Sequence, residues 1–231
     1  MTFSSPAGRT ASPGAHDEPP EPPGRFGLLL LLLIVNYLLA AFSIQKLAEP
    51  LQVVLFAAVI LLALRNSPLR RRQVRIAVAV VLTGSLAGVA AALTGARAGY
   101  GWAEIWKALI LLFSAVLIVR RVLARRTVTI QSIYGAISAY LIVGLMFAAC
   151  YAAIQSLGTA PFFVHGESAS PQIFQYFSFT TLTTLGYGDF TAAGDGGRAI
   201  ATLEALIGQV FLATLVARLV AAFRAPGERD G

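Results

Sequence analysis

The sequence predicts an all-α membrane protein with six transmembrane helices, and two observations carry this prediction. Of the 231 residues, 57% are hydrophobic and only 13% are charged, a balance that soluble domains rarely have. Apolar runs of about 20 residues, the length that a helix needs to cross the hydrocarbon core, also recur along the chain. The single cysteine, Cys150, lies within one of these runs, so an intrachain disulfide and a cysteine-based metal site are excluded.

The spans are expected wherever an apolar run approaches that length. They cover residues 26–44, 51–64, 76–93, 102–119, 129–157 and 199–223. The second run is short and is expected to extend by a few residues at each end. In the third run, Gly84 and Gly88 have the spacing that lets a second helix approach closely, although glycine is also simply tolerated in lipid.

The positions of basic residues predict a multi-pass protein of the cell membrane with both termini in the cytoplasm. Cytoplasmic loops are enriched in Lys and Arg, and three arginine clusters follow the second, fourth and sixth spans. They comprise Arg65, Arg70, Arg71, Arg72, Arg75, Arg120, Arg121, Arg125, Arg126, Arg224 and Arg229. The opposite loops hold only Lys46, Arg97 and Arg198 as cations. Because the net charge of +7 lies in clusters between apolar runs, nucleic acid is not an expected partner.

The two ends of the chain are expected to stay outside the folded part. Residues 1–25 are rich in proline, serine and glycine, so they are expected to form a disordered cytoplasmic tail, and residues 225–231 form a short C-terminal tail. Cleavage after Ala41 would make the first run a signal peptide. A retained helix is favoured, because a long tail precedes the run and the run is long enough to span.

The segment between the fifth and sixth spans is the most unusual part of the chain. It has about forty residues and lies on the outer side in this topology. Ser170 and Pro171 are typical of a helix start, with a hydroxyl N-cap and proline at the first helical position. The following PQIFQYFSFTTLTT carries no charge and reaches only about 20 Å as a helix, too short to span. The sequence therefore predicts a re-entrant helix.

The TLGYG strand, Thr184 to Gly188, follows this helix directly. Non-helical backbone at membrane depth is tolerated only inside protein or along a watery path. Glycines at alternate positions can adopt left-handed backbone angles, so successive carbonyl groups can turn to the same side. Leu185 and Tyr187 would then point away from the carbonyl line. The helix is expected to end near Thr183, so its negative dipole end would face a cation.

The run TTLTTLGYGD resembles the selectivity filter of potassium channels, and the resemblance extends over roughly residues 129–223. It implies a bacterial-type six-helix channel of the pore-loop, voltage-gated-like cation channel superfamily. K⁺ would bind at the backbone of Thr184, Leu185, Gly186 and Tyr187 as the permeant ion, with no other cofactor. One loop supplies a quarter of a coordination ring, so a homotetramer is expected.

Several residues around the strand are expected to support it. Leu185 replaces the valine that is usual in the family, and Thr180 stands where some relatives carry a glutamate. The expected supporting residues are Thr180, Thr183, Tyr176, Asp189 and Glu204, with Tyr176 hydrogen-bonded to Asp189 at the outer mouth. Glu204 lies inside the sixth span, where an isolated charge costs about 2.5 to 3.5 kcal/mol. It therefore needs a partner, such as Ser178, or a proton, unless it lies near the outer interface.

Two glycine-containing features lie outside the strand. Gly208 lies twenty positions after Gly188, where the family often has a gating hinge. Gly99, Tyr100 and Gly101 form a second GYG, but no hydroxyl-rich helix precedes it and no aspartate follows it. We therefore expect this second copy to be an ordinary external turn.

The first four spans, residues 26–119, resemble a voltage-sensor module without its arginine ladder. The fourth span holds only Glu104 and Lys107, near its outer end, whereas steep voltage gating requires several charges in each subunit. Weak or absent voltage dependence is therefore expected. Residues 120–128, RRVLARRTV, would be a basic linker to the pore domain, residues 129–224, and anionic lipids could bind it.

The potassium channel is the favoured function, and two alternatives stay open. A nonselective cation channel has the same architecture, and Tyr187 argues against it because relatives that admit sodium often carry another residue there. A non-conducting membrane partner subunit would leave an unbroken filter unexplained. An enzyme is not expected, because His16 and His165 have no evident carboxylate or cysteine partner.

Overall fold

The computed structural model describes residues 26–42, 58–59, 61–62, 72, 74–75, 78–79, 81–84, 86, 97–124, 128–166 and 170–224. Within these ranges the regular structure is helical, apart from one isolated antiparallel bridge between Phe163 and Ala192. The predicted tails, most of the second and third spans, and residues 125–127 of the linker lie outside the described residues.

The helices that the structure describes at length are α1 (Phe26–Phe42), α4 (Arg97–Ala124), α5 (Ile130–Leu157), α6 (Pro171–Leu182) and α7 (Asp195–Arg224). Three of them, α4, α5 and α7, are long and apolar enough to cross a membrane. They correspond to the predicted fourth, fifth and sixth spans. The apolar part of α1, Phe26–Leu39, is shorter than these three helices.

Helix α4 is longer than predicted, and the expected turn at the second GYG is wrong. Gly99, Tyr100 and Gly101 lie in the first turns of α4. The reason is helix packing: Gly101 is buried against α5, where a Cβ atom would lie 2.6 Å from Cγ of Leu157. Glycine costs a helix about 1 kcal/mol relative to alanine, and here close approach to α5 offsets that cost. The same extension places Arg120 and Arg121 inside α4.

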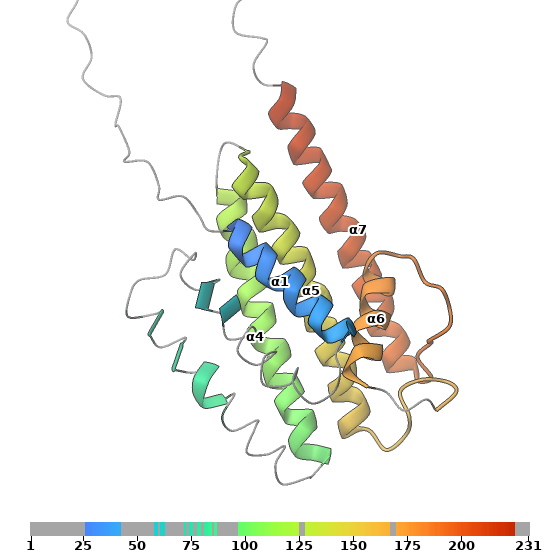
Figure 1. Cartoon of the computed structure of the whole chain (residues 1–231). Coiled ribbons are helices and arrows are strands. Elements are labelled where there is room, and N and C mark those ends of the chain that lie inside the picture. The colour runs from blue at the N-terminus through green and yellow to red at the C-terminus, as the bar shows by residue number, and fades with distance from the viewer. Residues whose placement is uncertain are drawn as a thin grey trace, which may run out of the picture.

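Helices α1, α4 and α5 share one apolar core. Figure 1 shows α4 and α5 side by side along most of their length, with α1 crossing α5. The core includes Leu29 and Leu33 of α1, Leu111 and Ile118 of α4, and Ile142 of α5. The first and fourth helices are therefore packed directly on the fifth.

Part of the third predicted span also contacts α4. Val78 and Val81 of that span, together with Val74 just before it, pack against Ile110 and Leu117 of α4. Gly84 faces the indole ring of Trp106, and a Cβ atom at Gly84 would overlap it. The close approach predicted for Gly84 is thus made to an aromatic side chain of α4, and Gly88 lies outside the described residues.

An aromatic cluster anchors the loops on both sides of α6. It contains Tyr151 of α5, Phe162 and Phe163 of the preceding loop, and Phe174 and Phe177 of α6. The amide of Val164 donates to the carbonyl of Thr191 at 3.0 Å, and that of Ala193 donates to Phe162 at 2.8 Å. The loop that precedes α6 is therefore hydrogen-bonded to the segment that follows the TLGYG strand.

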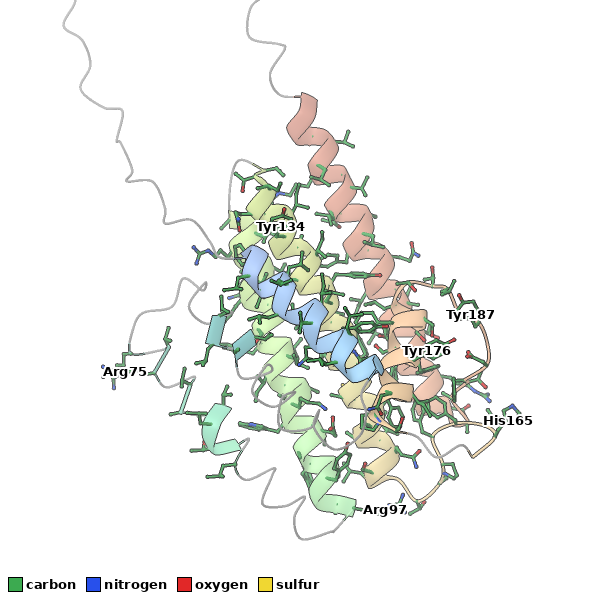
Figure 2. All side chains as sticks on the ribbon, viewed as in Figure 1. Arg75, Arg97, Tyr134, His165, Tyr176 and Tyr187 are labelled. Carbon is green, nitrogen blue, oxygen red and sulfur yellow. The ribbon has the colours of Figure 1, made fainter. Side chains whose placement is uncertain are left out.

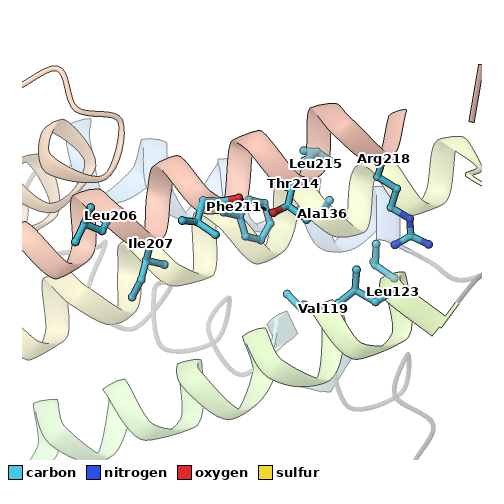
Figure 3. A pocket seen from close by; sticks show the side chains of 11 residues that line it. Val119, Leu123, Ala136, Leu206, Ile207, Phe211, Thr214, Leu215 and Arg218 are labelled. Carbon is cyan, nitrogen blue, oxygen red and sulfur yellow. Dashed lines mark hydrogen bonds between the residues drawn. The ribbon is translucent and has the colours of Figure 1, made fainter. Parts of the chain in front are cut away.

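Helix α7 exposes apolar side chains along its length. Val210 is 65% exposed and Leu206 is 59% exposed. Between α4, α5 and α7 lies an apolar cavity of about 410 Å³ with Arg218 at one end, and Figure 3 shows Val119 and Leu123 of α4 across it from α7. The exposed apolar surface of α7 requires apolar surroundings, which lipid or another protein chain can supply.

Candidate functional site

Helix α6 has the start and the end that the sequence predicts. Oγ of Ser170 accepts a hydrogen bond from the amide of Ile173 at 3.4 Å, and Pro171 occupies the first turn. The helix ends at Leu182, with Thr183 as its C-cap. Its 12 residues correspond to a length of about 18 Å, which is too short to cross a bilayer.

The backbone of the TLGYG strand alternates in handedness. Thr184, Gly186 and Gly188 have φ values of 58°, 52° and 81°, whereas Leu185 and Tyr187 between them are not in the positive-φ region. This alternation turns successive peptide groups so that their carbonyl oxygens can share one side. A Cβ atom at Gly186 or Gly188 would meet nothing within 4 Å. The backbone angle, and not lack of space, is what requires glycine there.

Hydrogen bonds attach the beginning of the strand to the end of α6. The amides of Leu185 and Gly186 donate to the carbonyl of Thr180 at 2.8 and 3.1 Å, and the amide of Thr184 donates to Thr181 at 2.9 Å. Within the described ranges, no hydrogen bond reaches the carbonyl oxygens of residues 184–188. The first amides are thus satisfied by α6, while the carbonyls are free to bind another group.

Thr184 has a strained conformation that its neighbours maintain. A positive φ is unusual for a β-branched residue and costs about 1 to 2 kcal/mol. Its Oγ1 donates to the carbonyl of Thr183 at 2.7 Å and accepts from Nε2 of Gln209 on α7 at 3.0 Å. Gln209 was not predicted. The available signal was a polar residue inside an apolar span, which is a weaker form of the argument that singled out the charged Glu204.

The predicted supporting threonines act mainly on α6 itself. Oγ1 of Thr180 donates to the carbonyl of Phe177 at 3.0 Å, and Oγ1 of Thr183 donates to that of Phe179 at 2.7 Å. The contact of Thr180 with the strand is made by its backbone oxygen, because that oxygen accepts the amides of Leu185 and Gly186.

Tyr176 and Asp189 meet beside the far end of the strand. The Tyr176 hydroxyl donates to Oδ2 of Asp189 at 2.7 Å. This hydrogen bond raises the pKa of Tyr176 to about 12, because loss of the hydroxyl proton would break the contact with Asp189. The Tyr176 ring also stacks on Tyr187 with a centroid separation of 6.5 Å. Both residues are labelled in Figure 2. Tyr187 is nevertheless 68% exposed and Leu185 is 54% exposed.

Glu204 lies behind α6 and is fully buried. Its Oε1 is 2.5 Å from Oγ of Ser178, and its Oε2 accepts from the Tyr151 hydroxyl at 2.6 Å. Ser178 also donates to the carbonyl of Gly144 at 2.7 Å. The contact with Ser178 was expected, but Tyr151 was not, because no local spacing rule relates residues 53 positions apart. The carboxyl group therefore connects α5, α6 and α7.

Gly208 contacts the end of α6. Helix α7 continues through this residue without interruption. A Cβ atom at Gly208 would overlap the carbonyl oxygen of Leu182, which also accepts the Tyr140 hydroxyl at 3.1 Å. The absence of a side chain thus lets α7 touch α6 one residue before the C-cap, whether or not Gly208 also serves as the predicted hinge.

Helix α5, the short α6 with the TLGYG segment that follows it, and α7 together have the arrangement of a pore-loop channel. A family profile described as an ion channel matches residues 136–225, which include all three parts. The chain is also 37% identical over 106 residues to Protein LctB of Bacillus caldotenax, and the match covers 43% of this chain and 78% of LctB. No solved structure matches the chain. The protein therefore belongs to this ion channel family and is a membrane protein of the pore-loop superfamily.

Proposed function

We propose that this protein is a potassium-selective channel in which residues 184–188 of four identical chains form the filter. The single observation that supports this best is the alternation of φ along Thr184, Gly186 and Gly188, together with carbonyls that accept no hydrogen bond in the described part of the chain. Rings of backbone carbonyls replace the hydration shell of K⁺ in selectivity filters. K⁺ would bind between the carbonyl layers of Thr184, Leu185, Gly186 and Tyr187.

Assembly into a cyclic homotetramer is part of the same proposal. One strand can surround only part of an ion, and cyclic closure of four copies would complete the ring. The exposed side chains of Leu185 and Tyr187, and the apolar surface of α7, fit burial against neighbouring copies and lipid. The N-terminal end of α7 would then lie near the outer mouth, and its C-terminal end would lie near the cytoplasm.

The proposed placement is in the cell membrane with both termini in the cytoplasm. Asp189 would lie at the outer mouth of each strand and attract cations to it. Residues 129–224 would form the pore domain. Residues 26–119 would form an attached module, which contacts the pore domain through the core shared by α1, α4 and α5.

Ion flux into liposomes tests this function. Purified full-length protein is reconstituted, its mass in detergent is measured, and uptake of K⁺ and of Na⁺ is compared. We expect a tetramer with K⁺ uptake far above Na⁺ uptake. Equal uptake of the two ions would instead support the nonselective cation channel, and a tetramer that conducts neither ion would support the non-conducting partner subunit.

Weak voltage dependence is a separate prediction. Within α4, Glu104 pairs with Lys107 at 2.5 Å near the outer end, and Arg120 and Arg121 lie in the last turns. No ladder of charges therefore crosses the middle of this helix, and each charge that crosses the field is worth about 2.3 kcal/mol per 100 mV. Patch-clamp recording should show a conductance that changes little with membrane potential. Lys107→Gln should leave the voltage response as it is, and a steep rise in either protein would contradict the prediction.

A further inference from the structure

The carboxyl group of Glu204 lies in a cluster of oxygen atoms that has too few hydrogens if the acid is ionised. Three short contacts join the Tyr151 hydroxyl to Oε2 at 2.6 Å, Oε1 to Oγ of Ser178 at 2.5 Å, and Oγ of Ser178 to the carbonyl of Gly144 at 2.7 Å. Tyrosine and serine supply one hydroxyl hydrogen each, and a backbone carbonyl supplies none. Two hydrogens cannot serve three contacts, so one pair of oxygens would face each other without a hydrogen.

The missing hydrogen has one natural position. Of the four groups, only the carboxyl can carry an additional proton at ordinary pH. A proton on Oε1 donates to Ser178, Ser178 donates to Gly144, and Tyr151 donates to Oε2. Each of the three contacts then contains one hydrogen, and all four groups are satisfied.

Among the residues that the structure describes, no group that acts on Glu204 carries a positive charge that would favour the ionised form. Helix α5 contributes the hydroxyls of Tyr140 and Tyr151 and the thiol of Cys150, and α6 contributes only the Ser178 hydroxyl. Helix α4 contributes the Glu104 carboxyl beyond Cys150, and that group is paired with Lys107. In the described part of the chain, no ion pair includes Glu204.

We propose that Glu204 is a protonated, neutral acid that positions α6 between α5 and α7, and that loss of this proton makes ion flux depend on pH. The effect on flux rests on the proposed channel function, because α6 holds the first amides of the TLGYG strand. Deprotonation places a charge in this buried site and leaves one contact of Ser178 without a hydrogen. The positioning effect is therefore complete at low pH and is lost as the pH rises through the titration of the acid.

Infrared spectroscopy tests the protonation state directly. The difference spectrum between the wild type and Glu204→Gln at neutral pH should contain the carbonyl stretching band of a protonated carboxylic acid, and this band should disappear at alkaline pH. Glu104→Gln is the matched control, because it removes a second buried glutamate that is paired with Lys107 and should change only carboxylate bands. A Glu204 difference spectrum with carboxylate bands alone would overturn the proposal.

Flux measurements test the proposed pH dependence of ion conduction. Wild-type K⁺ uptake should fall as the pH rises through the titration of Glu204. Glu204→Gln should conduct at neutral pH with a flat profile, because its amide can donate to Ser178 and accept from Tyr151 but does not titrate. If K⁺ uptake by Glu204→Gln falls with rising pH as it does in the wild type, the proposal is contradicted.

A second variant keeps the test independent of how well Glu204→Gln folds. Tyr151→Phe removes a donor that stabilises the carboxylate more than the neutral acid, so the midpoint of the wild-type profile should move to higher pH. A midpoint that stays or moves down would count against the proposal. The infrared band does not depend on conduction. If the wild-type protein shows the band but takes up no K⁺, only the channel proposal is refuted.

Discussion

Gly186→Ala is expected to abolish K⁺ uptake in liposomes while leaving the protein folded and tetrameric. Gly186 has φ of 52°, a conformation that costs an alanine about 1 to 2 kcal/mol, and each copy in the proposed ring would bear this cost. The alanine can relieve the strain only by rotating its peptide groups, which turns carbonyl oxygens away from the shared axis. Uptake should fall to the level of protein-free liposomes, measured together with the mass of the detergent-solubilised assembly.

Gly196→Ala provides the matched control for this change. A Cβ atom at Gly196 meets nothing within 4 Å, as at Gly186, but Gly196 lies in the first turn of α7 and has no positive φ. Alanine is favoured over glycine in a helix by about 1 kcal/mol, so this variant should conduct normally. K⁺ uptake at the wild-type rate in Gly186→Ala would show that the alternating backbone is not the conduction path.

Gly208→Ala is expected to lower the thermal stability of the assembled protein. Its Cβ atom would overlap the carbonyl oxygen of Leu182, and a backbone atom cannot move aside as the end of a side chain can. Overpacking of this kind typically costs about 1 to 3 kcal/mol. The midpoint of thermal unfolding of the proposed tetramer should fall, and K⁺ uptake should fall with it, because α6 must shift away from α7.

This experiment also separates the two roles considered for Gly208. A residue that acts only as a hinge predicts altered opening in single-channel records with unchanged thermal stability. A contact residue predicts reduced stability. Gly196→Ala again serves as the control, because it changes the same residue type in the same helix at a position without contacts. Unchanged stability in Gly208→Ala would contradict the contact role.

The structure of α6 and the TLGYG strand was largely predictable, because the signals that specify it act over a few residues. A serine N-cap followed by proline begins α6 at the expected residue, and the helix ends next to the expected Thr183. Alternate glycines in TLGYG predicted the positive φ values at Gly186 and Gly188, but they did not predict the positive φ of Thr184. That value is maintained by Gln209 and by the end of α6, which are contacts beyond the strand.

The second GYG shows where local signals fail. Gly99 and Gly101 have the residue types of a turn, yet they lie in α4 because Gly101 packs against Leu157 of the neighbouring helix. Glycine permits both a turn and a close helix contact. Only the presence of α5 beside this segment distinguishes the two.

Apolar runs, helix caps and the glycine spacing of the strand were determined by the amino-acid sequence itself, because hydropathy and backbone sterics are properties of neighbouring residues. The partners of Glu204, Thr184 and Gly208 were decided only by the tertiary structure. Tyr151, Gln209 and Leu182 reach these residues from other elements. Which side chains meet there depends on how the helices are rotated and packed, and no spacing along the chain encodes that rotation.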